Sequence, residues 1–214
     1  GFGSFEGVIK TKGELYDFLR KKEGSTVFIH HDNAYLMNIA EGLNLIPYGT
    51  EDDLYVNGRI TGNSPYLTFE WKAGKDGKSY QVQTQLIGEY NFPNALAAIT
   101  IGRFFGVEDA KINEALAGYT PQNNRSQLKK TDDNTLIIDA YNANPTSMMA
   151  ALQNFRNMEV PHKMLILGDM RELGAESAAE HQKIADYLKE CAFEKVWLVG
   201  DQFAAAEHSF QTYP

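Results

Sequence analysis

The sequence feature that most constrains the fold is the segment 136–145, Leu-Ile-Ile-Asp-Ala-Tyr-Asn-Ala-Asn-Pro. Apolar residues typical of a buried strand run directly into polar residues, and the closing proline is typical of the first turn of a helix. Ligands of open α/β sheets bind where strands end and helices begin, since a helix N-terminus offers free N–H groups. The segment therefore predicts a strand, a ligand-binding loop and a helix. The polar side chains expected at this sheet edge are those of Asp139, Tyr141, Asn142 and Asn144.

The second half of the chain alternates strands and helices at a spacing typical of a parallel, Rossmann-like sheet. A hairpin of two strands comes first, and the chain is expected to stop in a helix. In chain order, the predicted elements are strands 126–131 and 135–140, helix 146–158, strand 163–167, helix 177–190, strand 195–199 and a helix beginning at 201–208.

An antiparallel meander is predicted in the first half. Three segments, 54–60, 66–72 and 79–87, alternate in polarity and are rich in β-branched and aromatic residues, and a glycine-bounded turn at 74–78 joins the last two. The meander is expected at the side of an α/β domain, because a short buried strand and several helical segments surround it. Those elements are strand 26–30 and helices 35–41, 91–105 and 108–116.

Two local patterns predict how helices of the first half begin and pack. Thr11 and Glu14 have the spacing of a capping box, so a helix is expected to start at Thr11, after a glycine-rich loop over residues 1–8. Leu15, Phe18 and Leu19 then form its apolar stripe. The helix 91–105 carries small residues along one face, which favours close packing of that face on a sheet. These residues are Ala95, Ala98 and Gly102.

Composition limits the classes of function. The chain has 214 residues, 43% of them hydrophobic, which suffices for one or two cores. A formal charge of −8 argues against a nucleic-acid partner, and the single cysteine, Cys191, excludes an internal disulfide. No apolar run is long enough to span a membrane. Residues 119–124 are polar, contain proline and lack periodicity, so the expected domains are 1–121 and 122–214.

Three motifs carry a resemblance to a known family. They are Gly-Glu-Tyr-Asn-Phe-Pro-Asn-Ala at 88–95, Tyr-Asn-Ala-Asn-Pro at 141–145 and Leu-Gly-Asp-Met-Arg-Glu-Leu-Gly at 167–174. In this order they resemble the Mur ligases, and among these the members that add D-alanyl-D-alanine to UDP-N-acetylmuramoyl tripeptide. The resemblance covers the whole chain. It implies the α/β fold of part of a central, ATP-binding domain, then part of a Rossmann-like C-terminal domain, in a chain incomplete at both ends.

The resemblance implies an ATP-dependent amide ligase of peptidoglycan synthesis, cytoplasmic and monomeric. In the family, ATP phosphorylates a peptide carboxylate, and an amine attacks the acyl phosphate in the presence of Mg²⁺. No glycine-rich phosphate loop ending in lysine occurs here, so the chain by itself is not expected to bind ATP well or to turn over. The implied partners are UDP-N-acetylmuramoyl tripeptide and D-alanyl-D-alanine, with no nucleic acid and no membrane.

The resemblance also implies residues for the nucleotide and its metal. Lys12 is expected to carry a carbamate that binds Mg²⁺, although a solvated helix lysine is the alternative. Asn91 is expected to recognise adenine through its amide or to cap a helix, and Tyr90 replaces the family's histidine before it. His31 is expected to line the adenine side. A zinc site with His30 is disfavoured, because adjacent side chains at a strand end point to opposite faces.

The resemblance assigns the γ-phosphate to Arg125, whose guanidinium can bind it with two hydrogen bonds. An ordinary surface arginine is the alternative, and Asn124 replaces the family's glycine, so the turn is expected to differ. Asp139 is expected near the ribose or a phosphate-bound water. The other residues implied in this cleft are Tyr141 and Asn142 for the nucleotide and Asn144 for the peptide.

A second charged loop follows the strand 163–167 and is expected at the same sheet edge. Arg171 can bind the carboxylate of a zwitterionic D-alanyl-D-alanine, while Asp169 or Glu172 binds its ammonium group. A loop whose charges neutralise one another is the alternative. His181, on the next helix, is expected to be a packed or capping residue and not a catalytic base.

Two other functions fit part of the sequence. A folylpolyglutamate synthase-like ligase belongs to the same superfamily but differs at the motifs 141–145 and 167–174. A non-enzymatic nucleotide-binding module is the other alternative. Such a module is expected to close its last sheet, whereas this chain is expected to stop in a helix.

Overall fold

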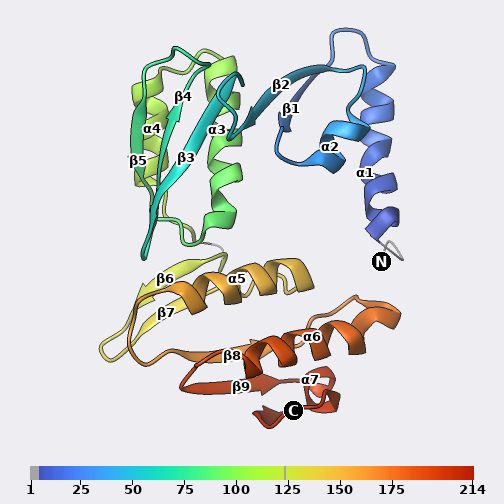
Figure 1. Cartoon of the computed structure of the whole chain (residues 1–214), viewed down its shortest axis with the longest axis vertical. Helices are drawn as coiled ribbons and strands as arrows, with labels where there is room; N and C mark the ends of the chain where they lie inside the picture. The colour runs from blue at the N-terminus through green and yellow to red at the C-terminus, as the bar shows by residue number, and fades with distance from the viewer. Residues whose placement is uncertain (1–4, 123) are drawn as a thin grey trace. The chain divides into compact units, whose positions relative to one another are not determined.

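The computed structural model describes residues 5–122 and 124–214. The described residues divide into two compact units, and the division falls between Pro121 and Gln122 (Figure 1). The first unit has one sheet with two hydrophobic clusters, and the second has two sheets and one hydrophobic core. No helix in the described part of the chain is both long and apolar enough to cross a membrane.

The first unit contains one five-stranded mixed sheet. Its strands are β1 (Thr26–His30), β2 (Asn44–Gly49), β3 (Val56–Asn63), β4 (Leu67–Lys72) and β5 (Tyr80–Gln83). The strand order is β1-β2-β3-β4-β5; the first two pairs are parallel and the last two antiparallel. The predicted meander is confirmed. It continues the parallel strands within the same sheet, however, and does not lie at the side of a separate domain.

The sequence pattern did not predict β2, because a proline interrupts it. Pro47 cannot donate a ladder hydrogen bond, and it lies in register with Ile29 of β1. The strand is nevertheless held at its end, where the His31 N–H donates to the Tyr48 carbonyl at 2.8 Å. Pairing with the neighbouring strands therefore outweighs the low strand propensity of this segment.

The first helix, α1 (Phe5–Arg20), is longer than predicted. Thr11 lies inside the helix, and residues 5–8 of the expected loop are helical; residues 1–4 lie outside the described part. The prediction of a capping box is therefore wrong. A capping box requires a free first turn, and here Val8 and Ile9, both half-buried, continue the helix before Thr11.

The face of α1 that packs also differs from the prediction. Tyr16 and Leu19 contact a small core around Ile29. Leu15 and Phe18 are 59% and 60% exposed, so the predicted apolar stripe is only partly buried.

The other helices of the first unit begin and end within a few residues of the prediction. They are α2 (Ala34–Ile39), the short 3-10 helix η1 (Glu89–Asn91), α3 (Phe92–Phe104) and α4 (Asp109–Gly118). In α3, Ala95 packs in the main core of the sheet, as predicted, together with the large residues Phe92, Leu96 and Ile99. The other two small residues lie elsewhere, since Ala98 is exposed and Gly102 faces Ile112 of α4.

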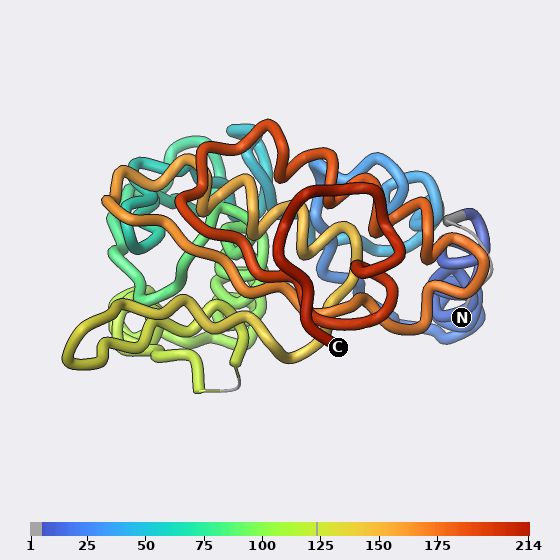
Figure 2. Tube along the Cα trace, turned by 90° about the horizontal axis from the view of Figure 1, so that it is seen from below, coloured from blue at the N-terminus to red at the C-terminus, as the bar shows by residue number. Residues whose placement is uncertain are grey.

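The second unit has two separate sheets. A hairpin of β6 (Gln127–Lys130) and β7 (Thr135–Ile138) forms the first, as predicted, and three parallel strands form the second. These are β8 (Met164–Gly168), β9 (Lys195–Val199) and β10 (Gln211–Tyr213), in the order β10-β9-β8. Figure 1 shows the hairpin in yellow, β8 in orange and β9 in red, and Figure 2 follows the same segments as a tube in the same colours. The parallel sheet is Rossmann-like, but β7 does not pair with it.

Three helices pack on the parallel sheet through one core: α5 (Pro145–Asn157), α6 (Ser177–Lys189) and α7 (Asp201–Ala205). The short 3-10 helix η2 (Gly174–Glu176) directly precedes α6. Leu152 of α5, Ile184 of α6 and Phe203 of α7 meet in this core with residues of β9. The end of the chain corrects a prediction: α7 stops at Ala205, and residues 211–213 form a strand that pairs with β9. Residues 206–209 are irregular, and the chain returns to the sheet after them.

Candidate functional site

A pocket of about 680 Å³ opens at the carboxyl end of the parallel sheet in the second unit. Its walls are the loop 168–174 after β8 and the turn between β9 and α7, with Ser177 and Pro214 at the sides. Open α/β sheets bind ligands at this end of their strands. The pocket contains the three charged residues that the sequence assigned to a dipeptide: Asp169, Arg171 and Glu172.

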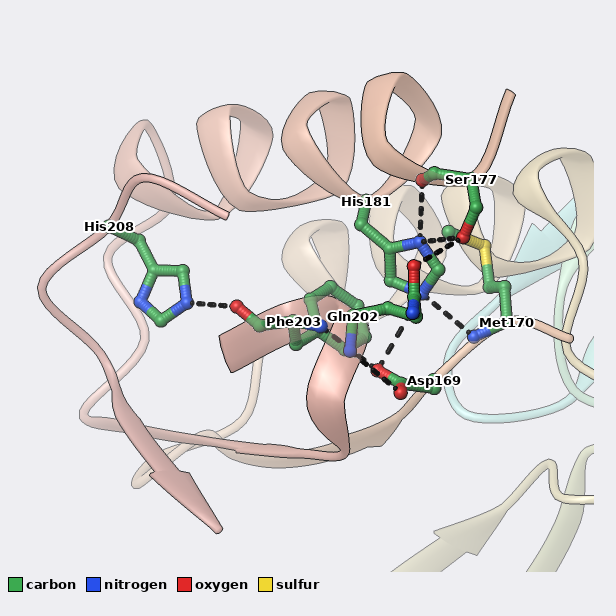
Figure 3. Close-up of polar contacts among 7 residues, drawn as sticks. All are labelled: Asp169, Met170, Ser177, His181, Gln202, Phe203 and His208. Atoms are coloured by element: carbon green, nitrogen blue, oxygen red, sulfur yellow. Dashed lines mark hydrogen bonds and ion pairs between the residues drawn. The ribbon is translucent and has the colours of Figure 1, made fainter. Parts of the chain in front are cut away.

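Asp169 is held by the first turn of α7. Its two carboxylate oxygens accept hydrogen bonds from the Gln202 and Phe203 N–H groups, each at 3.0 Å, as Figure 3 shows. Gly200 has φ +115°, and a Cβ there would collide with the Asp169 carboxylate, so only glycine fits this turn. The carboxylate therefore joins the loop after β8 to the turn after β9.

Arg171 and Glu172 lie at the exposed side of the same loop. Among the described residues, no ion pair joins Arg171 to Asp169 or Glu172, so the alternative of a self-neutralising loop is not what this structure shows. Glu172 has φ +66°, a left-handed conformation that non-glycine residues adopt uncommonly. Such backbone outliers cluster at ligand sites. A guanidinium and a carboxylate next to each other can bind the two charges of a zwitterion.

His181 lies beneath this loop and is fully buried. Its Nε2 accepts a hydrogen bond from the Met170 N–H at 3.0 Å, so the ring hydrogen is on Nδ1, which donates to the Ser177 carbonyl at 2.7 Å. Its ring and that of Phe203 pack edge to face, with the centroids 4.7 Å apart. These contacts confirm the prediction of a packed residue.

A second polar cluster lies at the open end of the β6–β7 hairpin. The Arg125 guanidinium stacks on the Tyr141 ring, 3.8 Å from its centroid, and both side chains are exposed. Asn124 and Ser126, on either side of Arg125, have φ +56° and +49°. Asparagine adopts this left-handed conformation more readily than most residues, so Asn124 can form a turn at the position where the resemblance places a glycine.

The neighbouring loop residues have structural roles as well. Asp139 accepts a long hydrogen bond, 3.4 Å, from the Ser126 hydroxyl. The Asn144 side chain accepts from the Ser147 N–H at 3.0 Å and caps α5. Asn142 is exposed. Because β7 and β8 belong to different sheets, the expectation that this loop and the loop 168–174 share one sheet edge is wrong.

In the first unit, Asn91 ends η1 and is half-buried. Its side-chain N–H donates to the Ile87 carbonyl at 2.9 Å, and its oxygen lies 3.4 Å from the Asn94 amide nitrogen. The side chain makes no capping bond to α3, so the capping alternative is wrong. Tyr90 lies against Gly88, whose φ is +91°, and a Cβ there would collide with the phenol ring.

The residues after β1 form a hydrogen-bonded turn. His30 stacks on Tyr48, with ring centroids 5.6 Å apart, and Asp32 accepts from the Thr50 N–H at 3.0 Å. Burial raises the pKa of the Tyr48 phenol, and the nearby Tyr16 raises it further. His31 is half-buried, with Nδ1 3.8 Å from a carboxylate oxygen of Glu51.

Lys12 is exposed in the middle of α1 and not in its first turn. Within residues 5–122 and 124–214, no three His, Cys, Asp or Glu side chains lie close enough to hold one metal ion. The described residues therefore do not by themselves form an Mg²⁺ site around Lys12.

In two of the predicted groups, the structure places the members close to one another. One group is the charged loop 169–172, and the other is the Arg125–Tyr141 pair. Sequence reasoning missed the contribution of Gly200 and Gln202 to the pocket. The only signal is the Val-Gly-Asp run at 199–201, where the predicted strand ends, and such a run is too common in turns to indicate a site.

Two models of protein families match the chain. The model described as Mur ligase middle domain matches residues 1–102, and the model described as Mur ligase, glutamate ligase domain matches residues 124–212. Together they account for most of the chain.

Curated relatives agree with the family models. The UDP-N-acetylmuramoyl-tripeptide–D-alanyl-D-alanine ligase of Bacillus subtilis (strain 168) is 30% identical over 207 residues, which cover 92% of this chain and 42% of that protein. The protein of the same name from Escherichia coli (strain K12) is 31% identical over 210 residues, covering 94% and 45%. The chain thus spans less than half the length of these relatives.

Solved structures share the fold. A crystal structure of MurF from Acinetobacter baumannii matches with a TM-score of 0.82 at 25% identity, covering 95% of this chain and 44% of that one. MurF ligase from Thermotoga maritima, in complex with ADP, matches with a TM-score of 0.81, but at 18% identity it shows the fold alone. The family models, the relatives and this fold show that the chain belongs to the Mur ligase family.

Proposed function

We propose that the chain is part of an ATP-dependent ligase that adds D-alanyl-D-alanine to UDP-N-acetylmuramoyl tripeptide in peptidoglycan synthesis. The observation that carries this proposal is the match, over more than nine-tenths of the chain, to two ligases named for that reaction. Since the chain spans less than half of each, it supplies only part of the proposed machinery.

The proposed reaction has two steps. A carboxylate oxygen of the tripeptide attacks the γ-phosphorus of ATP, and the bond from that phosphorus to ADP breaks. The dipeptide amine then attacks the carbonyl carbon of the acyl phosphate, loses a proton and expels phosphate. Positioning of the amine and stabilisation of negative charge account for most of the catalysis in reactions of this type.

The pocket after β8 is the proposed seat of the dipeptide. Arg171 offers a planar, permanently charged fork for the carboxylate, and Glu172 offers a partner for the ammonium group. The carboxylate of Asp169 is already bonded to α7, so in this proposal it shapes the pocket and lies beside the dipeptide. Asn144 remains a candidate for the peptide, with its amide N–H groups available after it caps α5.

The nucleotide roles remain proposals for residues of both units. Arg125, presented by its left-handed turn, suits a phosphate, and Asn91 keeps hydrogen-bonding capacity for adenine. The other proposed nucleotide contacts are His31, Asp139, Tyr141 and Asn142. These side chains offer hydrogen-bond donors and acceptors suited to a nucleotide. The described residues do not by themselves form an Mg²⁺ site, so Lys12 as a carbamate ligand stays a prediction and no step here depends on it.

A cytoplasmic, monomeric enzyme without nucleic-acid or membrane partners remains part of the proposal. ATP and UDP-linked substrates are consistent with that location, and the net charge of −8 disfavours phosphate-rich polymers.

The experiment that tests the proposal is phosphate release from ATP by the whole protein. We expect release that requires both UDP-N-acetylmuramoyl tripeptide and D-alanyl-D-alanine. Release that instead requires a folate and L-glutamate would favour a folylpolyglutamate synthase. ATP binding without any acceptor-dependent release would favour a non-enzymatic nucleotide-binding module.

A further inference from the structure

His181 is a buried, polar side chain to which the proposed reaction assigns no role. It lies in the second turn of α6 and has no exposed surface. A buried histidine must satisfy both ring nitrogens, and this one does so with two backbone groups from different segments, Met170 and Ser177.

The bond to Met170 fixes the loop at the point where it enters the pocket. The Met170 side chain is 1% exposed and packs in the core of the second unit, whereas Arg171 and Glu172, directly after it, are exposed in the pocket. Asp169, directly before it, is held by its own N–H, which donates to the Val199 carbonyl at 3.0 Å, and by its side-chain bonds to α7. The backbone is therefore fixed at the two positions that precede Arg171 and Glu172.

The donor and acceptor pattern requires an acceptor at the position of Nε2. The Met170 N–H points at this nitrogen, and the nearest carboxylate oxygen, on Asp169, lies 3.7 Å from it and is already bonded to Phe203. Without Nε2, the Met170 N–H would be buried and unpaired, which favours another position of the loop. Ser177 extends the same network, because its hydroxyl donates to the Gln202 side chain at the opposite wall of the pocket.

We propose that His181 is a positioning residue for the dipeptide: as a neutral acceptor it holds the Met170 backbone so that Arg171 and Glu172 face the pocket (Figure 3). The role of His181 in holding the loop follows from the hydrogen bonds alone. Its link to D-alanyl-D-alanine rests on the proposed function.

Two variants of the chain test the position of the loop. His181→Met removes the acceptor at similar length, while His181→Gln offers a carbonyl oxygen in its place. We expect amide hydrogen exchange of the peptide 168–174 to rise about tenfold or more in His181→Met and to stay within about threefold of wild type in His181→Gln. The peptide 195–199 in β9 is the internal control. Equal exchange in both variants, or an equal rise in the control peptide, would overturn the inference.

A kinetic measurement on the whole protein tests the link to the dipeptide. His181→Met is expected to raise the KM for D-alanyl-D-alanine about tenfold and to leave the KM for ATP within about twofold, with His181→Gln restoring most of the difference. Parallel changes in both KM values would contradict a positioning role. If the wild-type protein shows no dipeptide-dependent turnover, the proposed function fails, whereas the exchange experiment still decides the role of His181 in the loop.

Discussion

Asp169 and Arg171 are two residues apart in one loop, yet their surroundings differ. Asp169 is half-buried and accepts two backbone hydrogen bonds, and Arg171 is exposed without an ion pair to its acidic neighbours in the described structure. At the scale of single residues, the Asp169 carboxylate therefore has a structural role, whereas the Arg171 side chain is available to contact a ligand.

Substitution of Asp169 tests its structural role. Asp169→Ala leaves the Gln202 and Phe203 N–H groups without their partner, so we expect the free energy of unfolding to fall by about 1–2 kcal/mol. Urea denaturation measures this change. Asp201→Ala is the matched control, since Asp201 is exposed in the first turn of the same helix. An equal effect of both substitutions would contradict the capping role.

Sequence reasoning found the residue types of the site but not their partners. Asp169, Arg171 and Glu172 were identified as one charged group, and the pocket contains all three. That Asp169 bonds to α7, more than thirty residues later, depends on tertiary structure, which no local pattern predicts. The roles assigned to Lys12, Asn91 and Arg125 remain predictions.

At the scale of secondary structure, a lysine outside α5 donates hydrogen bonds to the carbonyl groups at the C-terminal end of this helix. The Lys163 ammonium group donates to the carbonyls of Phe155, Arg156 and Met158, the last two at 2.6 and 2.7 Å. These carbonyls belong to the last turn, where helical partners are missing and positive charge is favoured.

Removing this charge should loosen the end of α5. Lys163→Met is expected to lower the free energy of unfolding by about 1–3 kcal/mol, because charge-assisted bonds to three carbonyls are lost. Thermal or urea unfolding measures it. Lys189→Met removes a lysine that pairs with Asp186 on the surface and should have little effect. A larger effect at Lys189 than at Lys163 would contradict this account.

The strand β2 carries a prediction about pH. Burial raises the pKa of Tyr48 above its ordinary value of 10.0, so the folded chain keeps this proton at a pH where the unfolded chain loses it. The free energy of unfolding should therefore decrease as the pH rises above about 10. Tyr48→Phe should show a smaller decrease between pH 9 and pH 11 in urea denaturation. An unchanged pH dependence would show that Tyr48 does not contribute.

The elements that sequence patterns predicted best are those with strong local periodicity. The meander and helices α3 to α6 were predicted to within a few residues. The wrong or missing predictions have specific causes. Pro47 lowers the strand propensity of β2, and apolar residues before Thr11 continue α1 toward the N-terminus. The strand at 211–213 forms by pairing with β9. In each case contacts distant in sequence outweighed local propensity.

At the scale of the whole molecule, the chain has two units with separate cores. The main core of the first surrounds Phe69 and Trp71, and that of the second surrounds Leu198 and Phe203. Each core is formed by residues of its own unit alone, which is typical of independently folding domains.

The two units should therefore fold separately. We expect a chain of residues 122–214, expressed alone, to show a cooperative urea transition and a far-UV circular dichroism spectrum of an α/β protein. Residues 5–121 provide the complementary test. A fragment that unfolds without cooperativity would contradict the independence of its core.

The assignment of the pocket after β8 to the dipeptide is tested most directly by equilibrium dialysis of D-alanyl-D-alanine against the whole protein, with Arg171→Ala as the comparison. We expect saturable binding that weakens about tenfold or more in Arg171→Ala and is partly kept in Arg171→Lys, because lysine keeps the charge but not the planar fork. Equal affinity of the wild type and Arg171→Ala, or no binding to either, would contradict the assignment of this pocket to the dipeptide.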